Sequence, residues 1–419
     1  MKKVKNILFG AVAAFALAGC AKDDFTESIF DTTETGLDKT SYTYPLDAYL
    51  QDNFLNPYNV QFIYRMEDIG SDMQKDLVPA TYDQAKQLAV LCKYMWYDVY
   101  KELAGEKEVF LKKYSPRIIH LTGTPSYNSD GTETLGFATN GTKITLQAVN
   151  HLDFTQIEGH YGLNNLFFHT MHHEFTHILD QTISHPQAFN IISTGFYNND
   201  WHSTPNEIAV GNGFVTNYAS ANSTEDWAET VSNYITMNQQ DWDEMLKQAS
   251  FRWEQIDFRD DEQRDSVNRL YSLATRYPNL YDVDSIGRPF RLGSGEYKWV
   301  RKVIARNAIT GAPETDENGK IQYAADKPID AVSVINQKVQ LAREWLKDSY
   351  KIDIDALRKE VQQRQYLTDA DGNFVMSDDN QYINRLAQPD PEHPSQTLMQ
   401  TLLQAVDAYA VKSTDSSNE

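Results

Sequence analysis

The stretch His173-Glu174-Phe175-Thr176-His177 spells HExxH and decides how the surrounding chain folds. Residues four apart project from the same face of a helix, so both imidazoles can reach one Zn²⁺ ion at about 2.0–2.1 Å. Glu174 follows the first histidine and can take a proton from a zinc-bound water. The stretch therefore predicts a catalytic zinc site with His173 and His177 as ligands and Glu174 as general base. The alternative is a chance pair of helical histidines beside a solvated glutamate.

The residues around the motif predict one amphipathic helix over 163–183. The stretch contains no proline, Gly162 lies just before it, and Asn164 or Asn165 could cap its start. A helix of this kind places its apolar face in a core and turns its histidines toward a cleft. The predicted apolar face consists of Phe168, Met171, Phe175, Ile178 and Leu179.

Three other polar residues of this helix are candidates for supporting roles. His169 lies four before His173 but has no adjacent glutamate, and His172 points off the shared face, so both are expected to line the site or support its ligands. Asp180 returns to the histidine face three residues after His177. It could accept a hydrogen bond from the free nitrogen of a ligand histidine, or it could be a solvated surface acid.

The third zinc ligand must come from outside this helix, because a catalytic site uses three protein ligands. The longer pattern HExxHxxGxxH is absent, since Asp180 stands where the glycine would be. Glu225 and Glu229 lie four apart on a second predicted helix, which Ser223 or Thr224 could cap. One glutamate can bind zinc while the other orients the ligands. The alternative is a charged first turn that complements the helix dipole.

These residues together carry a family resemblance. The run from His173 to Asp180, followed by Tyr218 and by Glu225-Asp-Trp-Ala-Glu229, resembles the catalytic core of anthrax lethal factor. It is more similar to the zinc-binding metallopeptidase family of bacterial lipoproteins, which also matches in residues 56–62, 135–138, 143–146 and 149–150. The resemblance covers roughly residues 40 to 240. It implies a gluzincin-type peptidase with Glu225 as third zinc ligand and Tyr218 as an aid to catalysis.

The pattern of elements predicts an α+β fold. We expect a zincin-like catalytic domain over 41–245, with a small mixed sheet and an edge strand over the HExxH helix. Strands are predicted around 60–64 and 117–121, with a hairpin from 135–138 to 143–149. The second hairpin strand could form the cleft rim and add an extended substrate as a further strand, or it could be an ordinary sheet strand.

A mainly helical C-terminal region is expected over 246–419. Helices are predicted over 329–350, 354–364 and 396–411. The run Asp369-Ala-Asp371-Gly-Asn373 resembles a calcium loop, but Asn380 stands where the distal glutamate is needed, so a plain Asp-Gly turn is expected.

The N-terminus has the pattern of a bacterial lipoprotein signal. Three lysines precede a short apolar run, and Leu17-Ala18-Gly19-Cys20 resembles a lipobox, so residues 1–19 are predicted to be a signal peptide. Cys20 would then carry the lipid, and residues 20–40 would form an acidic tether. The expected location is the cell envelope, at the outer membrane and on its exposed face. The remaining cysteine, Cys92, is expected to be a small buried side chain.

Composition limits the partners of the chain. It has 419 residues and a formal net charge of −21, which argues against nucleic acid as a partner. The expected partner is a peptide or protein substrate, with membrane contact through the lipid anchor alone; the oligomeric state is left open. The 24 tyrosines and 7 tryptophans also suit a second hypothesis, a non-enzymatic surface lipoprotein that binds glycan or protein and has a structural or vestigial zinc site.

Overall fold

The computed structural model describes residues 37–65, 77–104, 107–127, 133–134, 136–139, 142–249, 252–257, 260–261, 290–292, 297–302, 317 and 330–410. The chain divides into two units, residues 1–44 and 45–419, and the features below belong to the second. The predicted signal peptide, the predicted lipidation site Cys20 and most of the predicted tether lie outside the described residues. Within the described part, no helix has the length and apolar character that a membrane span requires.

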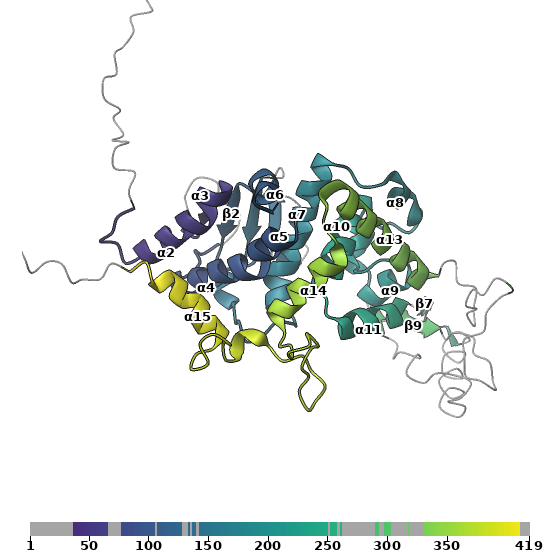
Figure 1. The fold of residues 1–419 in the computed structure, drawn as a ribbon. Helices are drawn as coiled ribbons and strands as arrows, with labels where there is room; N and C mark the ends of the chain where they lie inside the picture. The colour runs from purple at the N-terminus through teal and green to yellow at the C-terminus, as the bar shows by residue number, and fades with distance from the viewer. Residues whose placement is uncertain are drawn as a thin grey trace, which may run out of the picture. The chain divides into compact units, whose positions relative to one another are not determined.

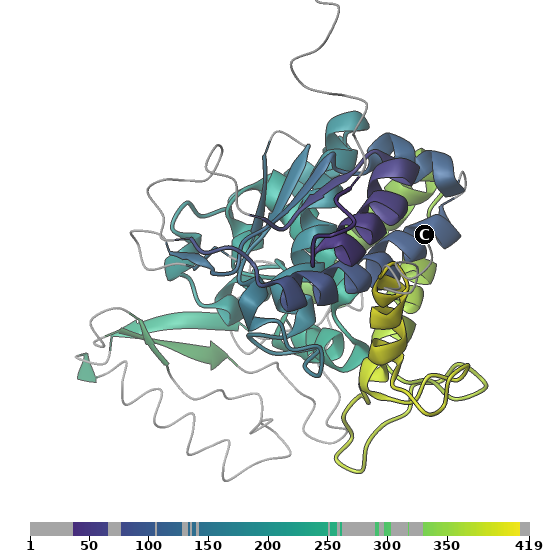
Figure 2. The same ribbon diagram turned by 90° about the vertical axis from the view of Figure 1, so that its left-hand side faces the viewer.

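A four-stranded mixed sheet forms one layer of the second unit (Figure 2). Strands β1 (Gln61–Ile63), β2 (Ile118–Leu121) and β6 (Lys143–Leu146) are parallel neighbours, and β5 (Gly136–Thr139) pairs antiparallel with β6. Alternate apolar side chains on one face of the sheet enter the core. These buried side chains are Phe62, Ile119, Leu121, Ile144 and Leu146. The predicted α+β class and the hairpin are confirmed.

Strand β6 is not the edge strand that the sequence suggested it could be. It pairs with β2 on one side and with β5 on the other, in the register Gly136↔Leu146 and Thr139↔Lys143. In the hairpin, β5 pairs with the side of β6 that β2 leaves open. This pairing occupies the backbone N–H and C=O groups of β6 to which a substrate strand would bind. The interpretation of 143–149 as an edge strand is therefore wrong, and β5 takes the outer position in this sheet.

Helices form most of the described chain around the sheet (Figure 1). Several α-helices continue directly into single π-helical segments, at 51–55, 93–97, 164–168 and 346–350. The helices are α2 (Tyr44–Leu50), α3 (Asn56–Tyr58), α4 (Tyr82–Cys92), α5 (Asp98–Leu103), α6 (Lys107–Tyr114), α7 (His169–Thr182), α8 (Gln187–Ile192), α9 (Asn206–Gly211), α10 (Ser223–Thr236), α11 (Gln239–Ala249), α13 (Ala331–Trp345), α14 (Ile354–Gln365) and α15 (Leu398–Asp407). Short strands β3 (Ser126–Tyr127) and β4 (Glu133–Thr134) pair with each other, and β7 (Arg252–Asp257), β9 (Tyr297–Lys302) and β8 (Phe290–Leu292) form a further sheet.

Helix α7 carries the HExxH motif, and its apolar face lies in the core as predicted. All five side chains of that face are at most 8% exposed. The predicted asparagine caps are wrong, because the helical backbone already includes residue 164 and neither side chain caps it. Asn164 instead donates to the carboxylate of Glu158 at 2.9 Å, and Asn165 donates to the backbone carbonyl of His160 at 2.8 Å.

Cys92 lies at the end of α4 and packs against α7. Its thiol is fully buried and free, with Sγ 3.7 Å from Sδ of Met171. Burial raises the pKa of the Cys92 thiol, because a thiolate would be poorly solvated there. The prediction of a small, buried cysteine is confirmed.

The C-terminal helices complete the core around α7 and α10 (Figure 1). Trp345 of α13 meets Trp227 of α10 edge to face, with ring centroids 5.1 Å apart. The Tyr350 hydroxyl donates to the backbone carbonyl of Leu179 at 2.5 Å. The three predicted C-terminal helices are present. The division at residue 245 stays a prediction.

Helix α15 and the loop before it are held by local hydrogen bonds. Thr397 caps α15 in a capping box with Gln400. In the loop, the Asp369 backbone pairs with Asn373, and Gly372 takes the left-handed conformation at φ 80°. This is the plain Asp-Gly turn that was predicted.

Candidate metal centre

Helix α10 lies against α7 and brings its first turn to the HExxH motif. Asn222 caps α10: its side-chain oxygen accepts from the backbone N–H groups of Thr224 and Glu225 at 3.0 and 3.1 Å. The predicted cap at Ser223 or Thr224 is therefore wrong by a residue, since Ser223 is already helical. Because the helix starts there, Glu225 lies in its first turn.

Three side-chain atoms converge between the two helices. His173 Nε2 lies 3.0 Å from His177 Nε2 and 3.1 Å from Glu225 Oε2, and the last two atoms are 3.3 Å apart. Ligands at about 2.05 Å from a tetrahedral zinc lie about 3.3 Å from one another, so the three atoms have the spacing of one tetrahedral face. Two imidazoles and a carboxylate are also a donor set that suits Zn²⁺.

A second carboxylate fixes the orientation of His173 from behind. Its Nδ1 lies 2.8 Å from Oε1 of Glu229, which is buried and also accepts from the Thr216 hydroxyl at 2.6 Å. A carboxylate only accepts, so the proton of a neutral His173 belongs on Nδ1 and its Nε2 lone pair faces His177 and Glu225. Glu229 therefore lies where the sequence placed an orienting glutamate.

A second group of possible metal ligands shares His173 but has a different character. It contains His169, whose Nε2 lies 3.0 Å from Oε1 of Glu229, together with His173 and Glu229 themselves. In this group the carboxylate oxygen already lies between two imidazole nitrogens that can donate to it. The group can satisfy itself through hydrogen bonds, whereas in the first group the Nε2 lone pair of a neutral His173 faces the Glu225 carboxylate, which is also an acceptor.

The pKa shifts of the histidine and glutamates in the centre favour a positive charge beside the carboxylates. Burial lowers the pKa of His173, but hydrogen bonds to Glu225 and Glu229 outweigh this and raise it to about 10. Burial raises the pKa of each glutamate, yet the neighbouring histidines hold both values below the usual glutamate range. A bound divalent cation would supply the charge that protons otherwise supply.

Tyr218 forms the wall of the centre beside His173. Its ring lies nearly parallel to the His173 ring, with centroids 5.8 Å apart, and the Trp201 ring supports it at 4.8 Å. Burial, the charge of Glu225 and a hydrogen bond with Glu225 raise the pKa of Tyr218 well above its ordinary value. The negative charge of Glu174 acts on both Tyr218 and His173, so this carboxylate also belongs to the centre.

Asp180 does not support a zinc-ligand histidine in the way the sequence suggested. Its Oδ1 accepts from the backbone N–H of His185 at 2.6 Å and pairs with Nδ1 of His185 at 2.8 Å. The chain leaves α7 just after Thr182, and this turn brings His185 back over Asp180. The suggested contact with a ligand histidine is replaced by contacts with His185 beyond the end of the helix.

His169 supports the ligands as expected, because it pairs with Glu229, whereas His172 neither lines the site nor contacts a ligand. His172 is fully buried and its Nδ1 lies 3.0 Å from the Tyr100 hydroxyl. Burial lowers the pKa of His172 to about 3. His202 is exposed and pairs with Asp200 at 3.1 Å. Thr216 and Trp201 support the centre, but no spacing in the sequence singles them out.

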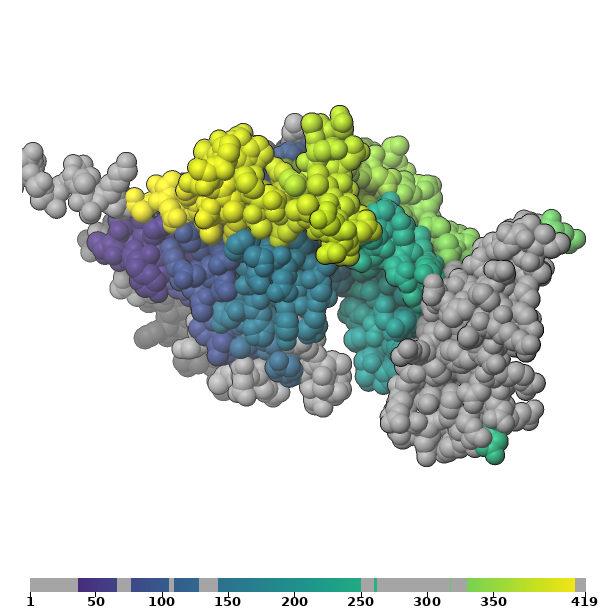
Figure 3. Space-filling model, turned by 90° about the horizontal axis from the view of Figure 1, so that it is seen from below, coloured from purple at the N-terminus to yellow at the C-terminus, as the bar shows by residue number. Residues whose placement is uncertain are grey.

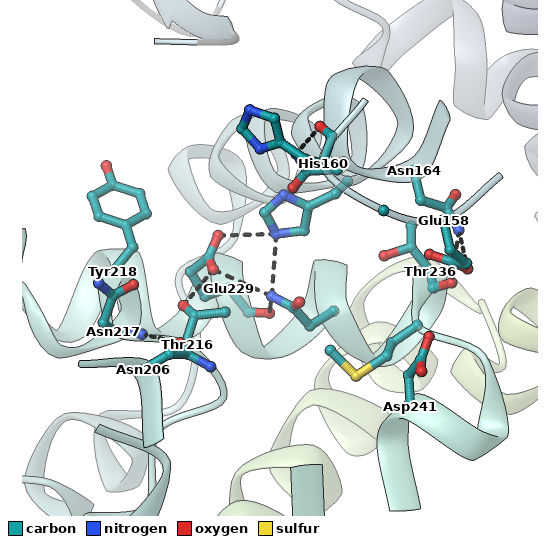
Figure 4. Close-up of a pocket in the computed structure, with 15 residues that line it drawn as sticks. Glu158, His160, Asn164, Asn206, Thr216, Asn217, Tyr218, Glu229, Thr236 and Asp241 are labelled. Carbon is teal, nitrogen blue, oxygen red and sulfur yellow. Dashed lines mark hydrogen bonds and ion pairs between the residues drawn. The ribbon is translucent and has the colours of Figure 1, made fainter. Parts of the chain in front are cut away.

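A cleft of about 550 Å³ opens beside the centre. Figure 3 shows it as a deep hollow between the residues near 150–165 and those near 205–240. Tyr218, Glu229 and His169 line its inner end, so it adjoins the metal centre directly (Figure 4).

Comparison with known proteins identifies the family. Residues 39–355 match the family described as putative zinc-binding metallo-peptidase. The chain belongs to this family. The resemblance drawn from the sequence is thereby confirmed for this metallo-peptidase family. A solved structure of a putative zinc-binding metallo-peptidase from Bacteroides caccae is similar, with 28% sequence identity and a TM-score of 0.51, over 77% of this chain and 93% of that one. Comparison with curated proteins gives no match.

Proposed function

We propose that this family member is a gluzincin-type peptidase that uses Zn²⁺ held by His173, His177 and Glu225. One observation carries the proposal: two imidazole nitrogens and a carboxylate oxygen lie 3.0–3.3 Å apart, which is the spacing of one face of a tetrahedral zinc site. The group has three members among the described residues, as expected of a catalytic site that keeps its fourth position open. A structural zinc site would instead be closed by four ligands.

The residues around this position have complementary roles. Zinc, when bound, supplies Lewis acidity that activates a water for attack and polarises the scissile carbonyl. Glu174 accepts the proton of the attacking water and returns it to the departing amine. Tyr218 donates a hydrogen bond to the oxyanion, and its raised pKa keeps the phenol protonated for this task. Glu229 keeps His173 in the tautomer that presents Nε2.

Strand β5 is the element best placed to hold the substrate backbone. It is the outer strand of the sheet and contacts α7, whereas β6 is paired on both sides. An extended peptide could add to β5 as a further strand, so that backbone hydrogen bonds bind it independently of its side chains.

The proposed location is the cell envelope. Cleavage before Cys20 and lipidation of its thiol would anchor the protein at the outer membrane, facing outward. The support for this is the basic, apolar and lipobox order of the first 20 residues. The proposed substrate is therefore an extracytoplasmic peptide or protein.

Glu174→Gln tests the reaction separately from zinc binding. The purified chain is expected to contain stoichiometric zinc by mass spectrometry and to cleave members of a proteome-derived peptide mixture. Glu174→Gln should retain the zinc while cleavage falls roughly 10²–10⁴-fold, the range that a general base contributes. Glu244→Gln, which changes an exposed glutamate of α11, is the matched control and should cleave normally.

Two results would contradict the proposal. The first is normal cleavage by Glu174→Gln, which would remove this carboxylate from the reaction. The second is stoichiometric zinc without cleavage of any peptide by the unchanged protein. That outcome would favour a surface lipoprotein that binds glycan or protein and uses zinc for structure.

A further inference from the structure

The cleft beside the metal centre has a defined direction. It begins at Tyr218 and Glu229, runs along α10 past Thr236, and ends at Glu158 and Asp241 (Figure 4). The segment before α7 supplies one wall, and the segment around 206–218 supplies the other. A substrate held at the metal centre would therefore extend one of its neighbouring side chains into this space.

The far end of the cleft is negatively charged. The carboxylates of Glu158 and Asp241 lie there, and Asn238 bridges them. The Asn238 Nδ2 lies 2.7 Å from Oδ2 of Asp241 and 3.5 Å from Oε1 of Glu158. Glu158 also accepts hydrogen bonds from Asn164 and from the Tyr366 hydroxyl. All of these donors are neutral. The described residues that line the cleft include no lysine or arginine, so no permanently charged cation of its wall neutralises these two carboxylates.

Glu229, at the inner end, differs from this pair. Its Oε1 lies within 3.0 Å of a ring nitrogen of His169 and of His173, so the Glu229 carboxylate already has hydrogen-bond partners within the protein. The unmatched charge is thus at the end away from the metal centre. Met237, which precedes Asn238 in the chain, also lines the cleft and offers an apolar surface to an aliphatic stem.

The end of the cleft at Glu158 and Asp241 suits a cationic side chain better than a second metal ion. The two groups of His, Asp and Glu with metal-ligand spacing among the described residues both lie around His173, and neither includes Glu158 or Asp241. A space of about 550 Å³ that includes Met237 in its lining also suits a long side chain better than an ion.

From these observations we infer that the cleft is a subsite for a lysine or arginine side chain of the substrate, with Glu158 and Asp241 as its specificity-determining residues. The inference rests on the proposed peptidase function. An aliphatic stem would lie along Met237, and the charged head would reach the two carboxylates. The net charge of −21 would also favour the approach of basic peptides.

The test compares arginine with citrulline, which has nearly the same shape but no charge. Peptides that the protein cleaves in a proteome-derived mixture are resynthesised with each arginine near the cleaved bond replaced by citrulline. We expect kcat/KM to fall about tenfold at one position, as for the loss of a charge-assisted contact. In Glu158→Gln combined with Asp241→Asn, the two peptides should be cleaved at rates within about twofold of each other.

Asp243→Asn is the matched control, because Asp243 is an exposed acid of the same helix that pairs with Gln239 and does not line the cleft. It should retain the preference for arginine. The inference is overturned if the unchanged protein cleaves both peptides equally at every position, or if the preference survives in the double variant.

A binding measurement separates this inference from the proposed function. Calorimetry on full-length Glu174→Gln uses a blocked alanine heptapeptide with one central arginine and its citrulline counterpart. Tighter binding of the arginine peptide that disappears when Glu158 and Asp241 are also changed supports the subsite even if the unchanged protein cleaves nothing. Equal binding of the two peptides, with cleavage intact, overturns the subsite and leaves the peptidase proposal standing.

Discussion

Helix α10 presents acidic residues to two different sides, and the two sides obtain their positive charge differently. On one side, Asp226 forms a buried ion pair with Lys338 of α13, with Nζ 2.7 Å from Oδ2 and both side chains fully buried. Lys338 also donates to the backbone carbonyl of Gly213 at 2.8 Å. On the other side, Glu225 meets the imidazoles of His173 and His177.

The two sides differ in the cation that faces the carboxylate: Asp226 has a lysine partner, whereas Glu225 faces two imidazoles that could hold a metal ion. Burial raises the pKa of Asp226 and lowers that of Lys338, and the attraction between the two opposes both shifts. The pair is complete within the protein. On the Glu225 side, two imidazole nitrogens and a carboxylate oxygen lie 3.0–3.3 Å apart, a donor set and spacing that suit a divalent cation. Adjacent residues of one helix turn therefore have different roles, one structural and one proposed for metal binding.

The largest expected effect is loss of zinc when the second side is removed. His177→Ala combined with Glu225→Ala should abolish stoichiometric zinc binding, because it removes two of the three proposed protein ligands and leaves a single imidazole. Metal content is measured on the purified protein by mass spectrometry. Asp180→Ala combined with His185→Ala removes a histidine–aspartate pair at the end of α7 and should leave zinc bound. Stoichiometric zinc in the first variant would contradict the assignment of the ligands.

The next effect concerns stability on the Asp226 side. Lys338→Met should lower the free energy of unfolding by about 3–5 kcal/mol, because it leaves the Asp226 carboxylate buried without its partner. Urea unfolding followed by circular dichroism measures the change. Lys347→Met, at an exposed position just after the same helix, should change stability by less than about 0.5 kcal/mol. Equal stability of the two variants would show that Asp226 does not depend on Lys338.

The smallest effect concerns the residue that links the two histidine groups. Glu229→Gln should weaken zinc binding about 10–100-fold, since it removes the charge that holds the Nδ1 proton of His173. Competition with a chelating dye measures the affinity. Thr216→Val removes only the hydroxyl that donates to Glu229 and should weaken binding less. An unchanged affinity in Glu229→Gln would show that His173 keeps its tautomer without this carboxylate.

Local patterns in the sequence predicted the elements of the site well. The HExxH spacing and the apolar residues around Phe175 fix α7 because helical periodicity needs no information from distant residues. The same argument placed Glu225 and Glu229 on one face of α10. The caps were less accurate: Asn222, not Ser223 or Thr224, caps α10, because several neighbouring polar residues compete for that position.

Long-range contacts decided what local patterns could not. The sequence suggested a contact between Asp180 and a ligand histidine. The turn after α7 instead places His185 within hydrogen-bond distance of Asp180. The sequence also allowed β6 to be an edge strand, which the pairing of β5 excludes. Both outcomes depend on where the chain goes after an element ends, and the spacing of residues within that element does not contain this information.

The sequence by itself determined that two histidines and a glutamate share one helix, that a second helix offers two more glutamates, and that the chain belongs with zinc-binding metallopeptidases. Only the tertiary structure decided that Glu225 faces both histidines, that Glu229 orients His173, and that Lys338 holds the opposite side of α10. Helical spacing fixes which side chains share a face, whereas the packing of α7, α10 and α13 fixes what each face meets.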